Sequence, residues 1–113
     1  MLAVLYYPDG NYGPVAEHLA QLAKECPKAF ARLVLDLEVL GAVGLRSQQI
    51  TIRLLGEKLW ELKRLYNGVQ YRLFFGVCKG AVWLLHNIEK KSAKTPKNDL
   101  ELARRRLKEV MAR

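Results

Sequence analysis

The sequence predicts an α+β fold made of an N-terminal strand, a helical hairpin, a three-stranded antiparallel meander and a C-terminal helix. Three observations support this fold class. Apolar residues recur at helical spacing between residues 14 and 40, they do so again after residue 96, and strand-like runs joined by two-residue turns fill residues 58–90. Half of the 113 residues are hydrophobic. We therefore expect a single domain over residues 1–113 with a core of its own.

The first half of the chain predicts one strand and two helices. Residues 2–7 are apolar and aromatic, and the turn residues 8–10 end this strand. Pro14 and Pro27 each suit the first position of a helix, and Gly41 is expected to end the second helix. The stripes that the two helices bury are Val15, Leu19, Leu22 and Cys26 in the first, and Phe30, Leu33, Leu37 and Leu40 in the second.

The second half predicts the meander and the last helix. Asn67-Gly68 joins strands at 58–66 and 69–78, and Lys79-Gly80 leads into a third strand at 81–90. Residues 50–54 add at most a short extended piece. Thr95 is the expected N-cap of the last helix and Pro96 its first residue. Because the strands and the helices are separated along the chain, we expect the helices to cover one face of the sheet.

Basic residues are concentrated in the second half of the chain. Residues 1–57 have a net charge of −1 and residues 58–113 a net charge of +9. This favours a polyanion or an acidic protein as partner. The two cysteines lack metal-ligand spacing, which favours free thiols in a reducing compartment. With neither a signal peptide nor a membrane-length apolar run, we expect a cytoplasmic protein without membrane contact.

Strand alternation gathers candidate polar residues on the predicted sheet. Glu61 and Lys63 share a face of one strand, and Arg72 lies opposite Tyr71 on the next. If the third strand is regular, one side carries Val82, Leu84, His86, Ile88 and Lys90. Arg72 in an apolar strand can clamp a phosphate, or it can pair with Glu61, and the two interpretations are compatible.

The chemistry of these residues suits a phosphodiester. His86 can transfer protons, or it can be a core histidine that donates to a backbone carbonyl. Lys90, Lys91 and Lys94 can hold phosphates and stabilise the transition state, or they can form a solvated loop. The arginines at 104–106 are expected to form a solvated face, or a surface for an acidic partner or a nucleic-acid backbone. RNA supplies its own nucleophile, the 2′-OH, so we expect cleavage without a metal or cofactor.

Several segments closely resemble the phage-derived branch of the RelE/HigB-like toxins of type II toxin–antitoxin modules. These segments are Leu59-Trp60-Glu61-Leu62-Lys63, Tyr71-Arg72-Leu73-Phe74-Phe75, Leu84-Leu85-His86, Lys90-Lys91, Lys94-Thr95-Pro96, Ala103 and Arg106. The resemblance implies a RelE-like, microbial ribonuclease-like fold. It also implies mRNA cleavage on the ribosome through 2′-OH attack, and a helix-turn-helix antitoxin as partner in a hetero-oligomer.

The resemblance also implies roles for individual residues. Arg72 would bind the scissile phosphate, and Glu61 and His86 would transfer protons. Lys63 and Arg64 would hold the RNA backbone, and the basic rim would consist of Lys90, Lys91 and Lys94 beside Thr95.

Two other functions fit the same sequence. A ParE-like relative would poison DNA gyrase with the same fold. A basic nucleic-acid-binding or ribosome-binding module would have no catalysis at all. Fold similarity does not separate these functions, because function resides in the site.

Overall fold

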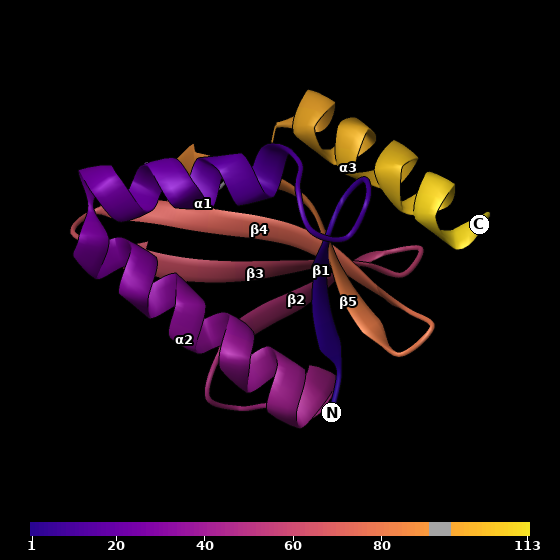
Figure 1. The fold of residues 1–113 in the computed structure, drawn as a ribbon, viewed down its shortest axis with the longest axis horizontal. Helices are drawn as coiled ribbons and strands as arrows, with labels where there is room; N and C mark the ends of the chain where they lie inside the picture. The colour runs from indigo at the N-terminus through magenta and orange to yellow at the C-terminus, as the bar shows by residue number, and fades with distance from the viewer. Residues whose placement is uncertain (91–95) are drawn as a thin grey trace.

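The computed structural model describes residues 1–90 and 96–113, and these residues form an α+β fold (Figure 1). The elements are β1 Ala3–Tyr6, α1 Pro14–Glu25, α2 Pro27–Val43, the short 3-10 helix η1 Gly44–Arg46, β2 Thr51–Gly56, β3 Leu59–Tyr66, β4 Val69–Cys78, β5 Ala81–Lys90 and α3 Lys97–Met111. No helix in the described ranges is both long enough and apolar enough to cross a membrane.

The strands form a mixed sheet of five strands rather than the three expected. Their order is β1-β5-β4-β3-β2; β1 runs parallel to β5, and the other neighbours are antiparallel. The predicted meander is β3, β4 and β5, with the Asn67-Gly68 and Lys79-Gly80 turns in place. The β2–β3 turn was not predicted, because Glu57 and Lys58 adopt positive φ angles of 51° and 69° without being glycine or asparagine.

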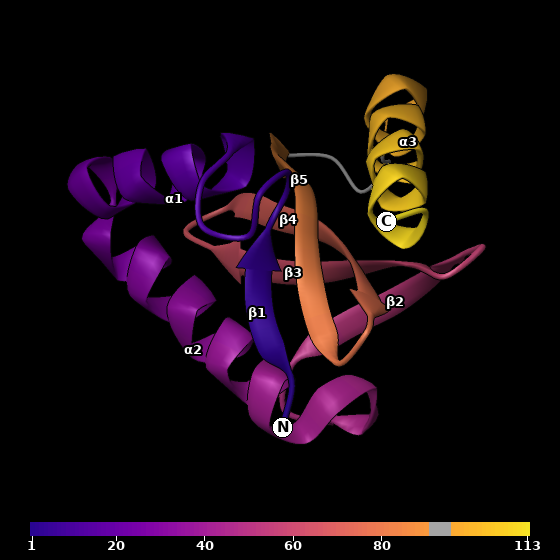
Figure 2. The same cartoon turned by 45° about the vertical axis from the view of Figure 1, so that its right-hand side comes forward.

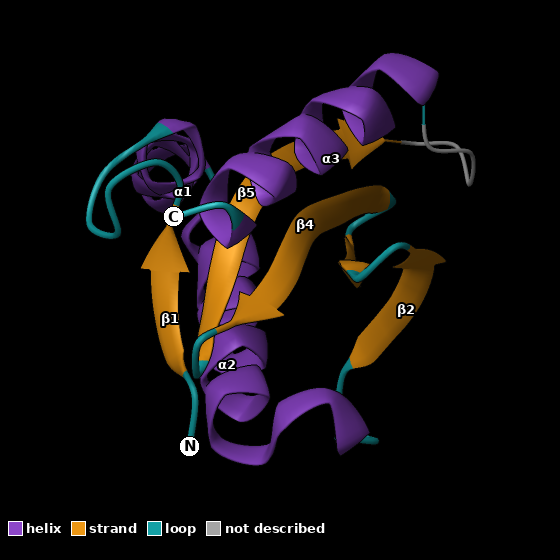
Figure 3. Ribbon diagram, turned by 90° about the vertical axis from the view of Figure 1, so that its right-hand side faces the viewer, coloured by secondary structure: helices purple, strands orange, loops and turns teal. Residues whose placement is uncertain are grey.

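The helices cover both faces of the sheet, which corrects the expectation of one covered face. Figure 2 shows α1 and α2 on one side and α3 on the other. The α1–α2 side holds the larger part of the core, including Leu33, Leu62 and Leu73. On the other side, α3 lies over β5 (Figure 3) and packs Ala103, Leu107 and Val110 against Leu59, Phe74 and Leu85.

Two helix boundaries differ from those predicted. The helix α2 runs through Gly41 and ends before Gly44, because Gly41 serves a contact rather than a stop. The backbone N–H of Leu2 donates to the Gly41 carbonyl at 2.7 Å, and a Cβ on Gly41 would lie 3.0 Å from the Leu2 carbonyl oxygen. The helix α3 begins at Lys97 with Pro96 as N-cap, and Thr95 lies outside the described residues.

A β-bulge in β5 decides which of its side chains face which helices. Phe75 pairs with Leu84 and Phe74 pairs with His86, so Leu85 is an extra residue between the two pairs. Val82 and Leu84 therefore face the α1–α2 core, whereas Ile88, two residues beyond His86, packs on the α3 side. The strand is therefore not regular, which was the condition for one shared side. The bulge reverses the alternation, so one side carries Val82 and Leu84 and the other carries His86, Ile88 and Lys90.

Arg104 and Arg106 hold α3 to the sheet instead of forming a solvated face. Arg106 donates Nη1–H to the carbonyl oxygen of Leu85 at 2.7 Å, and its guanidinium lies 5.0 Å from the centre of the Tyr7 ring. Arg104 donates to the carbonyl oxygens of Leu55 and Gly56 at 2.9 Å each. Of the three arginines only Arg105 is exposed. Arg106 thus satisfies a backbone carbonyl at the bulge itself.

We predict that Arg106→Ala lowers the free energy of unfolding by about 1–3 kcal/mol, because it leaves the Leu85 carbonyl without its charged donor. Urea unfolding followed by circular dichroism measures this loss. The matched control is Arg105→Ala, which should change stability by no more than about 0.5 kcal/mol. Equal effects of the two variants would show that the bulge does not depend on Arg106.

Candidate active site

The residues predicted to carry chemistry on β3, β4 and β5 meet on one face of the sheet, the face on which α3 packs. Side-chain alternation and the strand register place them there. Lys63 lies directly opposite Arg72, and Gln70 lies opposite Lys90. The residues that share this face are Arg53, Glu61, Lys63, Gln70, Arg72, His86 and Lys90. We call this set the polar face.

The centre of the polar face is a buried ion pair. The side chains of Arg72 and Glu61 are 0% and 1% exposed. Arg72 Nη1 donates to Glu61 Oε2 at 3.4 Å, and Arg72 Nη2 donates to Gln70 Oε1 at 2.7 Å. Arg53 Nη2 on β2 donates to the other Glu61 oxygen at 3.3 Å. The sequence-based alternative of an Arg72–Glu61 pair is therefore confirmed.

This burial changes what Arg72 and Glu61 can do. In this conformation neither side chain reaches solvent, so Arg72 does not stand as an open clamp for a phosphate and Glu61 does not stand ready to receive a proton from a substrate. A buried ion pair is costly to assemble and adds little net stability compared with apolar packing. Its position among polar neighbours on three strands is better suited to fixing the surface above it.

His86 is held by a carboxylate. Its Nε2 lies 2.7 Å from Oδ1 of Asp99 in the first turn of α3, and its ring stacks on Phe74 with centroids 5.9 Å apart. The side chains of His86 and Asp99 are 17% and 27% exposed. This partner differs from the backbone carbonyl expected for a core histidine. A histidine oriented by a carboxylate is the arrangement in which an imidazole transfers protons.

Lys63 and Lys90 are the two lysines of the polar face, and both retain access to solvent; the exposed Arg53 differs from them because it pairs with Glu61. Both are half-buried, and within residues 1–90 and 96–113 neither lies within ion-pair distance of a carboxylate. Lys63 also lies opposite Arg72 in the register. Glu61 compensates the charge of Arg72, whereas Lys63 has no carboxylate partner among the described residues. An anion bound at this position would therefore pair with Lys63.

Arg64 lies on the other face of β3 from Lys63 and does not belong to the polar face. Because successive side chains alternate along β3, Arg64 points to the α1–α2 side. There it donates Nε–H and Nη2–H to the buried Asp36 of α2, at 2.8 and 2.5 Å. This hydrogen bonding raises the pKa of Arg64 above its ordinary value. Arg64 therefore joins α2 to the sheet through Asp36, and its part in holding RNA stays a prediction.

Three predicted residues, Lys91, Lys94 and Thr95, lie outside the described residues, so their part in a basic rim stays a prediction. Three other residues of the site were not predicted: Arg53, Gln70 and Asp99. Gln70 had a usable signal, because it precedes Arg72 by two positions and so shares its face. Arg53 and Asp99 had none, because their contacts depend on an unpredicted hairpin and on the side that α3 covers.

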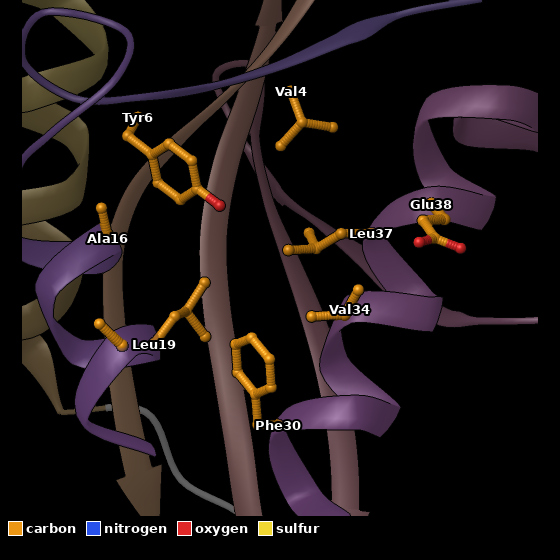
Figure 4. Close-up of a pocket in the computed structure, with 9 residues that line it drawn as sticks. Val4, Tyr6, Ala16, Leu19, Phe30, Val34, Leu37 and Glu38 are labelled. Carbon is orange, nitrogen blue, oxygen red and sulfur yellow. The ribbon is translucent and has the colours of Figure 1, made fainter. Parts of the chain in front are cut away.

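An apolar hollow lies away from the polar face. It has a volume of about 410 Å³ and opens between α1, α2 and β1 (Figure 4). Its walls are almost entirely apolar, with Leu19, Phe30 and Leu37 among them, and Tyr6 and Glu38 supply its polar groups. It contains neither a basic residue nor a histidine. Size therefore does not identify the site of chemistry in this protein.

A comparison with protein families identifies this chain's family. The family described as "Phage derived protein Gp49-like (DUF891)" matches residues 17–108, so the chain belongs to that family. The match confirms the phage-derived family that the resemblance indicated, whereas the placement among RelE/HigB-like toxins stays a prediction. Neither a curated protein nor a solved structure matches the chain significantly.

We predict that Arg72→Met lowers the free energy of unfolding by about 3–5 kcal/mol, because it removes one partner of a buried ion pair. The double variant Glu61→Leu/Arg72→Met should recover part of this loss, because both charges of the pair are removed together. Urea unfolding of the two single variants and the double variant gives the coupling energy. Additive effects would contradict a coupled pair, and Arg105→Met is the exposed-arginine control.

Proposed function

We propose that this member of the Gp49-like family is the toxin of a type II toxin–antitoxin module and cleaves mRNA on the ribosome. One observation carries the proposal: two cations that lack carboxylate partners in the described ranges, Lys63 and Lys90, share a face with a His86–Asp99 pair. Cations without counter-ions favour a polyanionic ligand, and a positioned histidine supplies proton transfer. The charge of +9 over residues 58–113 favours the same class of ligand.

The proposed reaction uses the 2′-OH of RNA as nucleophile. The 2′ oxygen attacks the neighbouring phosphorus and forms a bond to it, while the bond from phosphorus to the 5′ oxygen breaks. The proton of the 2′-OH passes to a base, and the leaving 5′ oxygen takes a proton from an acid. The products are a 2′,3′-cyclic phosphate and a 5′-OH, and no metal is required because the substrate itself supplies the nucleophile.

The proposed roles follow the access that each side chain has. Lys63 and Lys90 hold the phosphates on either side of the reacting bond and stabilise the charge of the transition state. His86 transfers a proton through Nδ1, because its Nε2 is held by Asp99. Glu61 and Arg72 become positioning residues, since both lie beneath the surface and connect β2, β3 and β4.

The proposed partners are mRNA, the ribosome and a helix-turn-helix antitoxin that neutralises the toxin in a hetero-oligomer. The support is the membership in a phage-derived family together with the basic second half of the chain. A gene for a small helix-turn-helix protein beside the gene of this chain would add independent support.

A second candidate function is favoured by one observation. Glu61 and Arg72, two of the residues expected to perform the chemistry, are buried and neutralise each other. A basic RNA-binding or ribosome-binding module that does not cleave RNA would retain Lys63 and Lys90 and would need neither group at the surface. Cleavage of cellular transcripts separates the two functions.

We predict that induced expression arrests growth and produces cuts in translated mRNA, which primer extension on cellular transcripts maps. Lys63→Ala/Lys90→Ala should reduce the cuts by about tenfold or more, because two phosphate-binding cations are lost. The matched control Arg105→Ala/Lys108→Ala removes the same charge from exposed positions of α3 and should leave the cuts unchanged. Growth arrest without cuts would favour the ParE-like gyrase poison or the non-catalytic module.

His86→Gln keeps the size and polarity of the side chain but removes its ability to transfer protons. We predict that it slows cleavage by about a hundredfold or more while the unfolding midpoint stays close to that of the wild type. Single-turnover cleavage of translated mRNA measures the rate. An unchanged rate would assign His86 a structural role, as a link between β5 and the first turn of α3.

A further inference from the structure

A second, smaller hollow opens on the polar face itself. It has a volume of about 220 Å³ and is lined by Thr51 of β2, Lys63 and Leu65 of β3, and Gln70 of β4. Lys63 lies opposite Thr51 on one side and opposite Arg72 on the other. The hollow therefore adjoins the buried Glu61–Arg72 ion pair. Lys63 follows Glu61 by two residues on β3, and Gln70 precedes Arg72 by two residues on β4.

The groups around this hollow differ in chemistry and fit one kind of ligand. Lys63 supplies a cation that has no carboxylate partner among the described residues. Gln70 uses Oε1 to accept from Arg72, so its Nε2 amide remains as a donor, and Thr51 adds a hydroxyl. Leu65 supplies an apolar wall and is 65% exposed. A ligand that matches this set has an anionic group, a flat apolar surface and a polar edge.

A nucleotide has these three parts: a phosphate, the face of the base and the hydrogen-bonding edge of the base. Single-stranded RNA presents its bases unstacked, so proteins can pack apolar side chains against their faces and bind their edges. An acidic peptide would also pair with Lys63. It would not explain why the amide of Gln70 lies beside the apolar side chain of Leu65. The observations therefore favour a nucleotide.

We propose that the hollow formed by Thr51, Lys63, Leu65 and Gln70 is a subsite for one nucleotide of the RNA. Leu65 packs against the base, Thr51 and the Gln70 amide contact its polar edge, and Lys63 holds its phosphate. Gln70 also accepts a hydrogen bond from Arg72, so a ligand in the subsite contacts a residue that is bonded to the buried ion pair. This inference rests on the proposed action on RNA. It assigns a binding position to the base next to the reacting phosphate.

The test is a titration of the ¹⁵N-labelled full chain with a short single-stranded RNA of mixed sequence in which every 2′-OH is methylated to prevent cleavage. We expect the largest chemical-shift changes at the backbone amides of Thr51 and Leu65 and at the side-chain amide of Gln70. Leu65→Thr should weaken binding by about tenfold, because the base loses its apolar wall.

The matched control is Leu54→Thr. Leu54 is another exposed leucine on a strand of the same sheet, but its register partner Trp60 packs on the α1–α2 side. The affinity of the Leu54→Thr variant for the RNA should stay within about twofold of that of the wild type. Thr51→Val removes a hydroxyl at nearly constant volume and should weaken binding without a change in unfolding midpoint.

Three outcomes would overturn the subsite: no binding of the RNA, shift changes confined to other surfaces, or equal affinities of Leu65→Thr and the wild type. If an acidic peptide displaces the bound RNA and produces the same shift changes on its own, the hollow is instead a site for a protein partner. If RNA shifts the subsite residues while cellular transcripts stay uncut, the subsite stands and the nuclease activity fails.

Discussion

The single extra residue in β5 is the feature on which both the fold and the candidate site depend. Without Leu85, the strand would keep one alternation from end to end, and His86 and Lys90 would face the α1–α2 core. With it, the first half of β5 packs under the helical hairpin and the second half turns its polar side chains toward α3. Arg106 donates to the carbonyl oxygen of Leu85, the extra residue of the bulge, so the helix that follows the site also stabilises its geometry.

The polar groups on this face divide into two levels. Beneath the surface, Glu61 and Arg72 neutralise each other. Gln70 and the exposed Arg53 are further partners, and together the four residues connect three strands. Such a network contributes little to net stability, and natural proteins accept such costs mainly where a site requires them. At the surface, Lys63 adds a charge opposite Arg72 and has no carboxylate partner within the part of the chain that the structure describes. The buried Glu61–Arg72 pair holds the strands in place, and the charge of Lys63 above it is available to bind an anion.

The parts of this structure that depend on local sequence could be predicted, and those that depend on distant contacts could not. Asn67-Gly68 favours one turn geometry and was read correctly, whereas Glu57 and Lys58 adopt the same left-handed conformation without any residue that favours it. The apolar stripe of α3 predicts that the helix is buried, but it does not say on which face of the sheet. The bulge at Leu85 leaves no mark in the sequence, so alternation placed His86 correctly beside Lys90 but wrongly beside Leu84. Whether Arg72 is open or paired depends on burial, which the sequence does not specify.

The salt dependence of RNA affinity tests most directly whether Lys63 and Lys90 contact the phosphates of RNA. Each phosphate contact to a single strand contributes about 0.7 to the slope of log affinity against log salt concentration. For Lys63→Ala/Lys90→Ala we expect a slope shallower than that of the wild type by about 1.4, which corresponds to two lost contacts. A slope that stays at the wild-type value would show that RNA binds without contacting these lysines.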